Sequence, residues 1–505
     1  MACISFLLLS LTASGPQPRR MTEQYFPEIV ALEKVTPGLQ KDKGFTRYSE
    51  LIAFLEQLRG SDSTLVHLSY LGSSHKGKPI PWVRLYRRPQ GGSKPIEVWM
   101  QGGLHGDEPA STEGLLYLLA QCARHWDRLP FSANIALNVV PMVNPDGYEL
   151  QERENAQGLD LNRDQTKLMA AESLPLKRLM AQIHPHVAVD FHEYRPFRRD
   201  YVHLGEFGVC GAYDVMFLNS THPNLPGQWS ELRRTSFEKP LYAILDQNHI
   251  THHDYFTPEQ QDGKTVFRVG SDNARSSSSN FALQGMLSTL VEVRGVGLER
   301  TSFTRRVYIT YLVARTFLEQ AGLSRELLHG LRGGAQPFPD SIAIRSRRTE
   351  YSDSLTFLDI ESNQPIRLPV VLEDARRQRI TQKRSCPEAY AVSMREDEII
   401  RRLTAFGLKA DTLPAGIQLE TESFVAATVV ADPLPYEKVR TLNIPVRLVR
   451  ARVSTPEPWL RFSMRQPRAL IMPELLEPDA PNSLFRFSVV KTESNSTLPV
   501  YRIPK

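Results

Sequence analysis

The feature that most constrains this chain is the stretch VWMQGGLHGDE at residues 98–108. Val98 and Trp99 end an apolar run that predicts a buried strand, and the two glycines that follow break it. His105 and Glu108 therefore lie three positions apart on a tight turn at the end of that strand. An imidazole nitrogen and a carboxylate oxygen are ligands that a catalytic zinc ion commonly uses, so this turn indicates a metal site.

The HxxE spacing alone is not specific, because a second copy occurs at His203 and Glu206. Three further motifs follow the first copy in order: NPDG at 144–147, RENAQGLDLNRD at 153–164 and DFHEY at 190–194. Together with GGLHGDE, these motifs resemble those of the M14 zinc carboxypeptidases. The resemblance extends over about residues 48–319, which is more than half of the chain.

Strand-like and helix-like patterns alternate through this region. Strands are predicted at 64–70, 81–86, 134–143, 187–191 and 287–293, and helices at 48–58, 111–125, 174–183, 231–248 and 303–321. The alternation predicts an α/β sheet with helices on both faces and a ligand crevice at its strand ends. The resemblance implies a carboxypeptidase-like mixed sheet. The looser stretch at 205–280 is typical of insertions that wall a substrate cleft.

A chain of 505 residues is too long for one ordinary core. We predict a signal peptide at 1–20, a catalytic domain at 21–329, a Gly/Pro-rich linker at 330–345 and a smaller β-rich domain at 346–505. Within the last region, the segment LRFSMRQPRALIMPELLEP resembles C-terminal regions that accompany some bacterial M14 enzymes.

Charge and hydropathy limit the possible partners. The net charge of +5 is spread over the chain without a basic patch interleaved with aromatics, which argues against nucleic-acid binding. The apolar run at 4–13 is too short for a stable membrane span and is typical of a signal peptide, although a basic n-region is missing. We therefore expect a periplasmic or secreted protein, or a cytoplasmic one if translation starts at Met21.

The resemblance implies that His105, Glu108 and His192 bind one Zn²⁺ ion in the catalytic domain. His192 follows a strand-like run, whereas His184 and His186 precede that strand and compete poorly for the site. Taken without its neighbours, His192 could equally be an ordinary histidine at the edge of a core.

Glu292, in TLVEVRG, is the candidate general base. An ionisable group inside an apolar strand is costly unless it is paired or faces a cleft, and the resemblance places the catalytic glutamate in this setting. A carboxylate beside zinc-activated water can take its proton and later pass it to the leaving amine. The alternatives are that Glu292 is a buried partner of Arg294, or that Glu299 is the base.

The resemblance assigns further roles in RENAQGLDLNRD. Asp160 would orient the first zinc-binding histidine through its far ring nitrogen, and Arg153 would stabilise the oxyanion. Asn162 and Arg163 would bind the terminal carboxylate of the substrate, for which the planar guanidinium is well shaped. The non-functional alternatives are that Asp160 caps a helix or turn and that the arginines are exposed to solvent.

The chain departs from the digestive-type pattern at one point. The active-site tyrosine of the family is expected some twenty residues before Glu292, but GSDNARSSSSNF at 270–281 contains none. Tyr255 is the nearest tyrosine upstream, and Arg275 or Asn280 could take part of its role. The pocket for the terminal side chain is therefore unassigned.

These observations predict a metallocarboxypeptidase that hydrolyses C-terminal amide bonds of peptides with a free terminal carboxylate. An amidohydrolase of the desuccinylase and aspartoacylase type, acting on small N-acyl amino acids, is the first alternative, and the extra domain argues against it. A non-catalytic peptide-binding module is the second; it predicts a lost ligand or base, and the sequence retains both.

Overall fold

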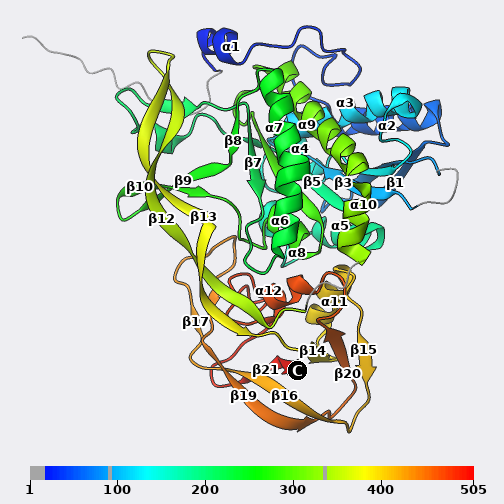
Figure 1. Ribbon diagram of the computed structural model, residues 1–505, viewed down its shortest axis with the longest axis vertical. Coiled ribbons are helices and arrows are strands. Elements are labelled where there is room, and N and C mark those ends of the chain that lie inside the picture. The colour runs from blue at the N-terminus through cyan, green and yellow to red at the C-terminus, as the bar shows by residue number, and fades with distance from the viewer. Residues whose placement is uncertain (1–16, 89–93, 334–337) are drawn as a thin grey trace, which may run out of the picture.

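The computed structural model describes residues 17–88, 94–333 and 338–505 (Figure 1). Its centre is an eight-stranded mixed sheet with the strand order β1-β2-β4-β3-β5-β11-β7-β8. The bounds of these strands are β1 Val66–Ser73, β2 Pro79–Leu85, β3 Ile96–Gln101, β4 Ile135–Val140, β5 Val187–Tyr194, β7 Val215–Asn219, β8 His252–Asp254 and β11 Leu287–Arg294. The central strands β4, β3, β5 and β11 run parallel to one another.

Helices cover both faces of this sheet, as predicted. The helices of this part of the chain are α1 Arg19–Tyr25, α2 Tyr48–Ser61, α3 Pro109–His125, α4 Pro145–Leu150, α5 Ser173–Ile183, α6 Gly227–Arg233, α7 Lys239–Gln247, α8 Ser277–Leu283, α9 Phe303–Leu323 and α10 Arg325–Gly333. Apolar side chains of α2, α3, α7 and α9 pack on one face, and those of α5 and α8 join a separate core on the other. Because β5 is covered on both sides, all of its residues are buried.

The segment predicted as a helix at 231–248 is helical from Gly227 to Gln247, but it is not one regular α-helix. The chain forms two helices, α6 and α7, joined by a π-helical turn at Arg234–Glu238. Pro240 lies in the first turn of α7, and a proline has no N–H to continue the hydrogen-bond ladder of a preceding helix.

The C-terminal part is rich in strands. Its elements are β12 Ser341–Asp359, β13 Pro365–Ser385, β14 Ala389–Ser393, α11 Asp397–Ala405, β15 Asp411–Leu413, β16 Gln418–Ala426, β17 Val430–Ala431, β18 Leu442–Asn443, β19 Val446–Ser454, β20 Trp459–Ser463, α12 Met472–Leu476 and β21 Thr497–Ile503. A six-stranded sheet, in the order β15-β20-β14-β21-β16-β19, organises this region. It lies at the lower end of the molecule in Figure 1.

The long hairpin β12–β13 joins this region to the insertion at 205–280. The insertion contributes β6 (Val209–Gly211), β9 (Phe256–Gln261) and β10 (Lys264–Val269), and the five strands form one sheet in the order β6-β12-β13-β10-β9. The hairpin runs along the left side of Figure 1 from the upper to the lower part of the molecule. The two parts of the chain therefore share a sheet.

The predicted linker at 330–345 overlaps two of these elements, since α10 continues to Gly333 and β12 begins at Ser341. Its central residues 334–337 lie outside the described part of the chain. The proposed boundary at 345 would cut β12, so the division into a catalytic and a C-terminal domain stays a prediction.

The predicted signal peptide lies mostly at residues 1–16, outside the described residues. Near its end, Gln17 is buried, and its Oε1 accepts a hydrogen bond from Nε of Arg294 at 2.9 Å. Among the helices that the structure describes, none is both long and apolar enough to cross a membrane.

A chain that ends at Pro337 tests the division into domains. We expect its unfolding temperature to fall by about 10 °C or more, because β6 loses its partner β12, β10 loses β13 and Phe267 loses its packing against Phe357. Thermal unfolding followed by circular dichroism measures the change. An unfolding temperature equal to that of the full chain would show that the peptidase core folds without the hairpin.

Candidate metal centre

The predicted ligands meet where two neighbouring strands end. His105 follows β3, and Glu108 is the residue immediately before α3, whose first residue is proline. His192 lies on β5, which pairs in parallel with β3 through Gln101 and Asp190. Since parallel neighbours end at the same edge of a sheet, the turn after β3 reaches His192.

The three side chains are buried and converge closely. Nδ1 of His105 lies 2.7 Å from Oε1 of Glu108, and Nδ1 of His192 lies 2.8 Å from Oε2 of the same carboxylate. The two Nδ1 atoms are 3.1 Å apart. Within the described residues, these three form the group of side chains whose ligand atoms all lie within 4.8 Å of one another, as a metal ion requires.

A carboxylate faces the far nitrogen of each imidazole. Nε2 of His105 lies 3.0 Å from Oδ1 of Asp160, and Nε2 of His192 lies 2.9 Å from Oδ2 of Asp190. A carboxylate accepts a hydrogen bond, so each Nε2 carries the proton and each Nδ1 of a neutral ring turns a lone pair inward. Two lone pairs and a carboxylate at this separation repel one another unless a cation lies between them.

The electrostatics of the site favour such a cation. Burial would lower the pKa of His192, but the carboxylates of Asp190 and Glu108 raise it well above its usual value. Burial would raise the pKa of Glu108, yet His105 and His192 hold it below its ordinary value. The donor set of two imidazoles and one carboxylate, each imidazole held by an outer carboxylate, fits a catalytic zinc ion.

Asp190 is not among the site residues that the sequence predicts, although it lies in the DFH motif. The sequence could have indicated it, because residues two apart on a strand lie on the same face of the sheet. Asp190 and His192 are two apart on β5. Glu193, on the opposite face, pairs with Arg306 and accepts a hydrogen bond from the backbone N–H of Ala110 at 2.9 Å. It thereby ties β5 to the start of α3.

Glu292 lies beside the ligands on the next strand. β11 pairs in parallel with β5, and Glu292 stands directly opposite His192. Burial raises the pKa of Glu292 to about 7; His192 lowers it and Glu108 raises it further. The alternative partner, Arg294, instead donates to Gln17 and to the carbonyl of Gly211.

The side chains of Arg153 and Asp160 both contact His105. Nε and Nη2 of Arg153 donate to Oδ2 of Asp160 at 3.0 and 2.8 Å. The remaining nitrogen, Nη1, lies 3.1 Å from Nδ1 of His105 and 3.6 Å from Oε1 of Glu108. Burial would raise the pKa of Asp160, but His105 and Arg153 hold it well below its usual value.

Asn162 and Arg163 follow in a single 3₁₀ turn that Asp160 caps through the N–H of Asn162. Oδ1 of Asn162 accepts a hydrogen bond from the backbone of Ser277 at 2.8 Å, which leaves its amide NH₂ for a ligand. Arg163 donates from Nη1 to the carbonyl of Asn162 and lines a cavity of about 300 Å³.

Tyr255, Arg275 and Asn280, the three candidates for the role of the family's active-site tyrosine, lie in different environments. Burial and the carboxylate of Glu292 both raise the pKa of Tyr255, so this side chain lies within electrostatic reach of Glu292. The side chain of Asn280 accepts a hydrogen bond from Lys177 at 2.7 Å in a buried network that also includes Gln284. Arg275 is directed to Glu437 and Tyr436 of the C-terminal region.

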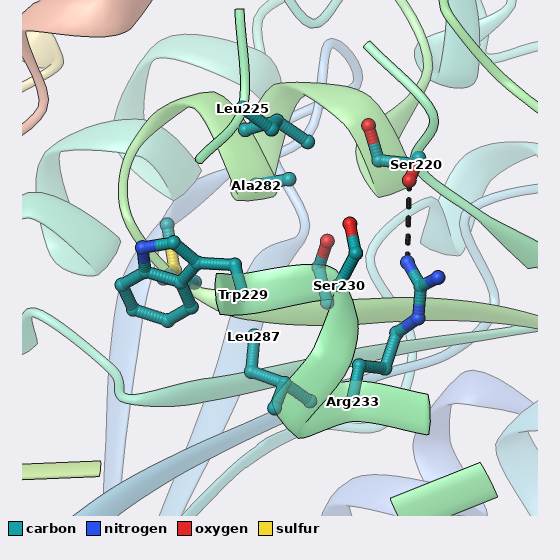
Figure 2. Close-up of a pocket in the computed structure, with 9 residues that line it drawn as sticks. Ser220, Leu225, Trp229, Ser230, Arg233, Ala282 and Leu287 are labelled. Carbon is teal, nitrogen blue, oxygen red and sulfur yellow. Dashed lines mark hydrogen bonds between the residues drawn. The ribbon is translucent and has the colours of Figure 1, made fainter. Parts of the chain in front are cut away.

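A second, smaller cavity lies at the other end of β11. Figure 2 shows Trp229, Arg233 and Leu287 around it, with Nη1 of Arg233 donating to the carbonyl of Ser220 at 3.2 Å. Its volume of about 20 Å³ holds roughly one water molecule. This cavity is too small for a peptide, and Leu287 and Glu292 stand near opposite ends of the strand.

Comparison with known proteins agrees with this geometry. The profile of the zinc carboxypeptidases, peptidase M14, matches residues 51–194. Carboxypeptidase 2 of Trichophyton equinum is 26% identical over 475 residues, which cover 91% of this chain and 87% of that protein. Carboxypeptidase SOL1 of Arabidopsis thaliana is 30% identical over 141 residues, 27% of this chain and 28% of that protein.

Among solved structures, the metallo-carboxypeptidase of Burkholderia cenocepacia aligns with 55% of this chain and 70% of its own, at 18% identity and a TM-score of 0.43. The profile match contains both metal-ligand motifs, and the Trichophyton match extends into the C-terminal region. Residues 51–194 therefore match the zinc carboxypeptidases, peptidase M14, and most of the chain is similar to a fungal carboxypeptidase.

Proposed function

We propose that this enzyme is a zinc-dependent carboxypeptidase that hydrolyses the C-terminal amide bond of peptides with a free terminal carboxylate. The observation that carries the proposal is the position of Glu292, which its strand register sets opposite His192 and which lies within electrostatic reach of His105 and Glu108. A base at this position serves hydrolysis, whereas a purely structural metal site has no use for it.

His105, Glu108 and His192 would hold one Zn²⁺ ion. When bound, zinc polarises a carbonyl and makes water acidic enough to react near neutral pH. Glu292 takes a proton from the attacking water on its carboxylate and returns it to the nitrogen of the leaving amine. Its raised pKa suits both tasks, because the carboxylate is basic enough to accept the proton and acidic enough to give it up.

Arg153 supports the charge that develops on the carbonyl oxygen. Its two hydrogen bonds to Asp160 fix the guanidinium plane and direct Nη1 toward the ligands. A donor held in place before the reaction costs no reorganisation in the transition state. Asn162 and Arg163, on the same loop, offer an amide and a guanidinium to the terminal carboxylate of the peptide.

Two substitutions separate metal binding from proton transfer. His192→Ala should remove bound zinc, because one of three ligands is lost. Glu292→Gln should keep the metal and lower kcat by about 10²–10⁴-fold. Zinc content by atomic absorption and kcat on a blocked dipeptide measure the two effects, and equal zinc in wild type and His192→Ala would refute the ligand assignment.

Asp190→Asn tests the carboxylates that hold the far nitrogens of the imidazole rings, without removing a metal ligand. Because Asp190 orients His192, this change should weaken zinc affinity by about 10–100-fold without abolishing binding. A competition titration with a chelator measures the affinity. Unchanged affinity would mean that the Asp190 hydrogen bond does not hold the ring.

Amidated substrates test the recognition of the chain end. An amide cannot pair with Arg163, so amidation should lower kcat/KM by about two to four orders of magnitude, and Arg163→Ala should shrink this gap. Steady-state kinetics on peptide pairs that differ only in the end group give the ratio. Equal rates on the free-acid and the amidated peptide would contradict the exopeptidase assignment. Activity on N-acyl amino acids alone would indicate a deacylase.

We also propose that the protein is exported to the periplasm or the medium, on the basis of the apolar run at 4–13. Cleavage near residue 20 would remove Gln17 and its hydrogen bond to Arg294. N-terminal sequencing of the mature protein should begin near residue 21 in the exported fraction. A cytoplasmic product that begins at Met1 would contradict export.

A further inference from the structure

A tight turn from the C-terminal region reaches the loop that carries Arg153 and Asp160. Residues 432–441 connect β17 and β18, and Tyr436 and Val439 exchange backbone hydrogen bonds of 2.8 and 3.0 Å. The two residues between them, Glu437 and Lys438, have φ values of 50° and 63°. This is the two-residue hairpin turn that normally prefers Asn-Gly, so a Glu-Lys pair is strained there and depends on tertiary contacts.

Ionic contacts with the peptidase core supply that support. Glu437 forms ion pairs with Lys167 and Arg275, which are 4% and 7% exposed. Nη2 of Arg275 donates to the hydroxyl of Tyr436 at 3.1 Å, and its guanidinium lies 4.8 Å from the centre of that ring. Glu437 is therefore a positioning residue, because its carboxylate fixes the turn against two buried cations.

The turn forms one wall of the cavity of about 300 Å³ that Arg163 lines. The charged residues around this cavity are Glu154, Asp160, Arg163, Asp164, Lys167, Glu437 and Lys438. Asp160 is paired with Arg153, Lys167 with Glu437, and Asp164 accepts hydrogen bonds from the backbone N–H groups of Met169 and Ala170. Glu154 is exposed at the rim.

Among the residues that the structure describes, Arg163 and Lys438 are the two cations lining this cavity that form no ion pair. Arg163 donates to the carbonyl of Asn162, and Lys438 donates to the carbonyl of Gln157 at 3.4 Å. The ammonium of Lys438 lies against Gly158, where an added Cβ would stand 1.8 Å from Nζ. Gly158 has a φ of 67°, so a glycine both permits the loop conformation and leaves room for the ammonium.

We propose that this cavity receives the side chain of the last residue of the substrate, and that Lys438 makes the enzyme prefer an acidic one. The inference rests on the proposed function, in which Arg163 binds the terminal carboxylate. A terminal glutamate presents two carboxylates, and Arg163 and Lys438 offer two cations that line one cavity. The C-terminal region thus contributes a specificity-determining residue to the peptidase site.

The test compares N-acetylglutamate with its neutral isostere N-acetylglutamine as ligands of the full-length, zinc-loaded protein. Calorimetry should show about fivefold tighter binding of the glutamate form, the ratio expected for one partly exposed ion pair. Lys438→Met should abolish this preference and Lys438→Glu should reverse it. Arg440→Met, an exposed cation two residues further along, is the matched control and should leave the ratio unchanged.

The same ratio should appear in kcat/KM for blocked peptides that end in glutamate or glutamine. Hydrolysis of both peptides with a ratio that Lys438→Glu does not change would overturn the pocket assignment and leave the carboxypeptidase proposal standing. A binding preference that depends on Lys438, in a protein that hydrolyses neither peptide, would support the pocket and contradict the proposed reaction.

Discussion

The site is organised by two imidazole nitrogens and one carboxylate that face one another where β3 and β5 end. Two Nδ1 atoms 3.1 Å apart face one carboxylate in a buried site, and carboxylates hold both rings from behind. This arrangement is unfavourable without a cation. The packing of two parallel strands, each enclosed by helices, holds the ligands in position, and the remainder of the centre is arranged around them.

The parallel register of β11 and β5 then positions the proposed general base. It sets Glu292 opposite His192, where burial and the neighbouring carboxylate of Glu108 raise the pKa of its carboxyl group. A shift of one residue would turn Glu292 to the other face of the sheet. The same strand carries Arg294 into a different environment, where Gln17 and Gly211 accept its hydrogen bonds.

Much of the α/β region could be predicted from periodicity, because its helices and buried strands each carry one repeating apolar face. The division at 330–345 was harder to predict from local sequence. Composition changes there, but β12 and β13 pair with β6 and β10 from an insertion far earlier in the chain. Strand partners distant in sequence leave no local signal, and neither does the approach of Glu437 to Arg275.

The sequence by itself determined the ligand motifs, the candidate base and the loop with Arg153 and Arg163, since short spacings on turns and strands fix which side chains can act together. Only the tertiary structure decided that Tyr255 lies within electrostatic reach of Glu292 and that residues 436–439 wall the cavity beside Arg163. The physical reason is that these contacts depend on strand register and on packing between distant segments. Such packing is a property of the whole folded chain.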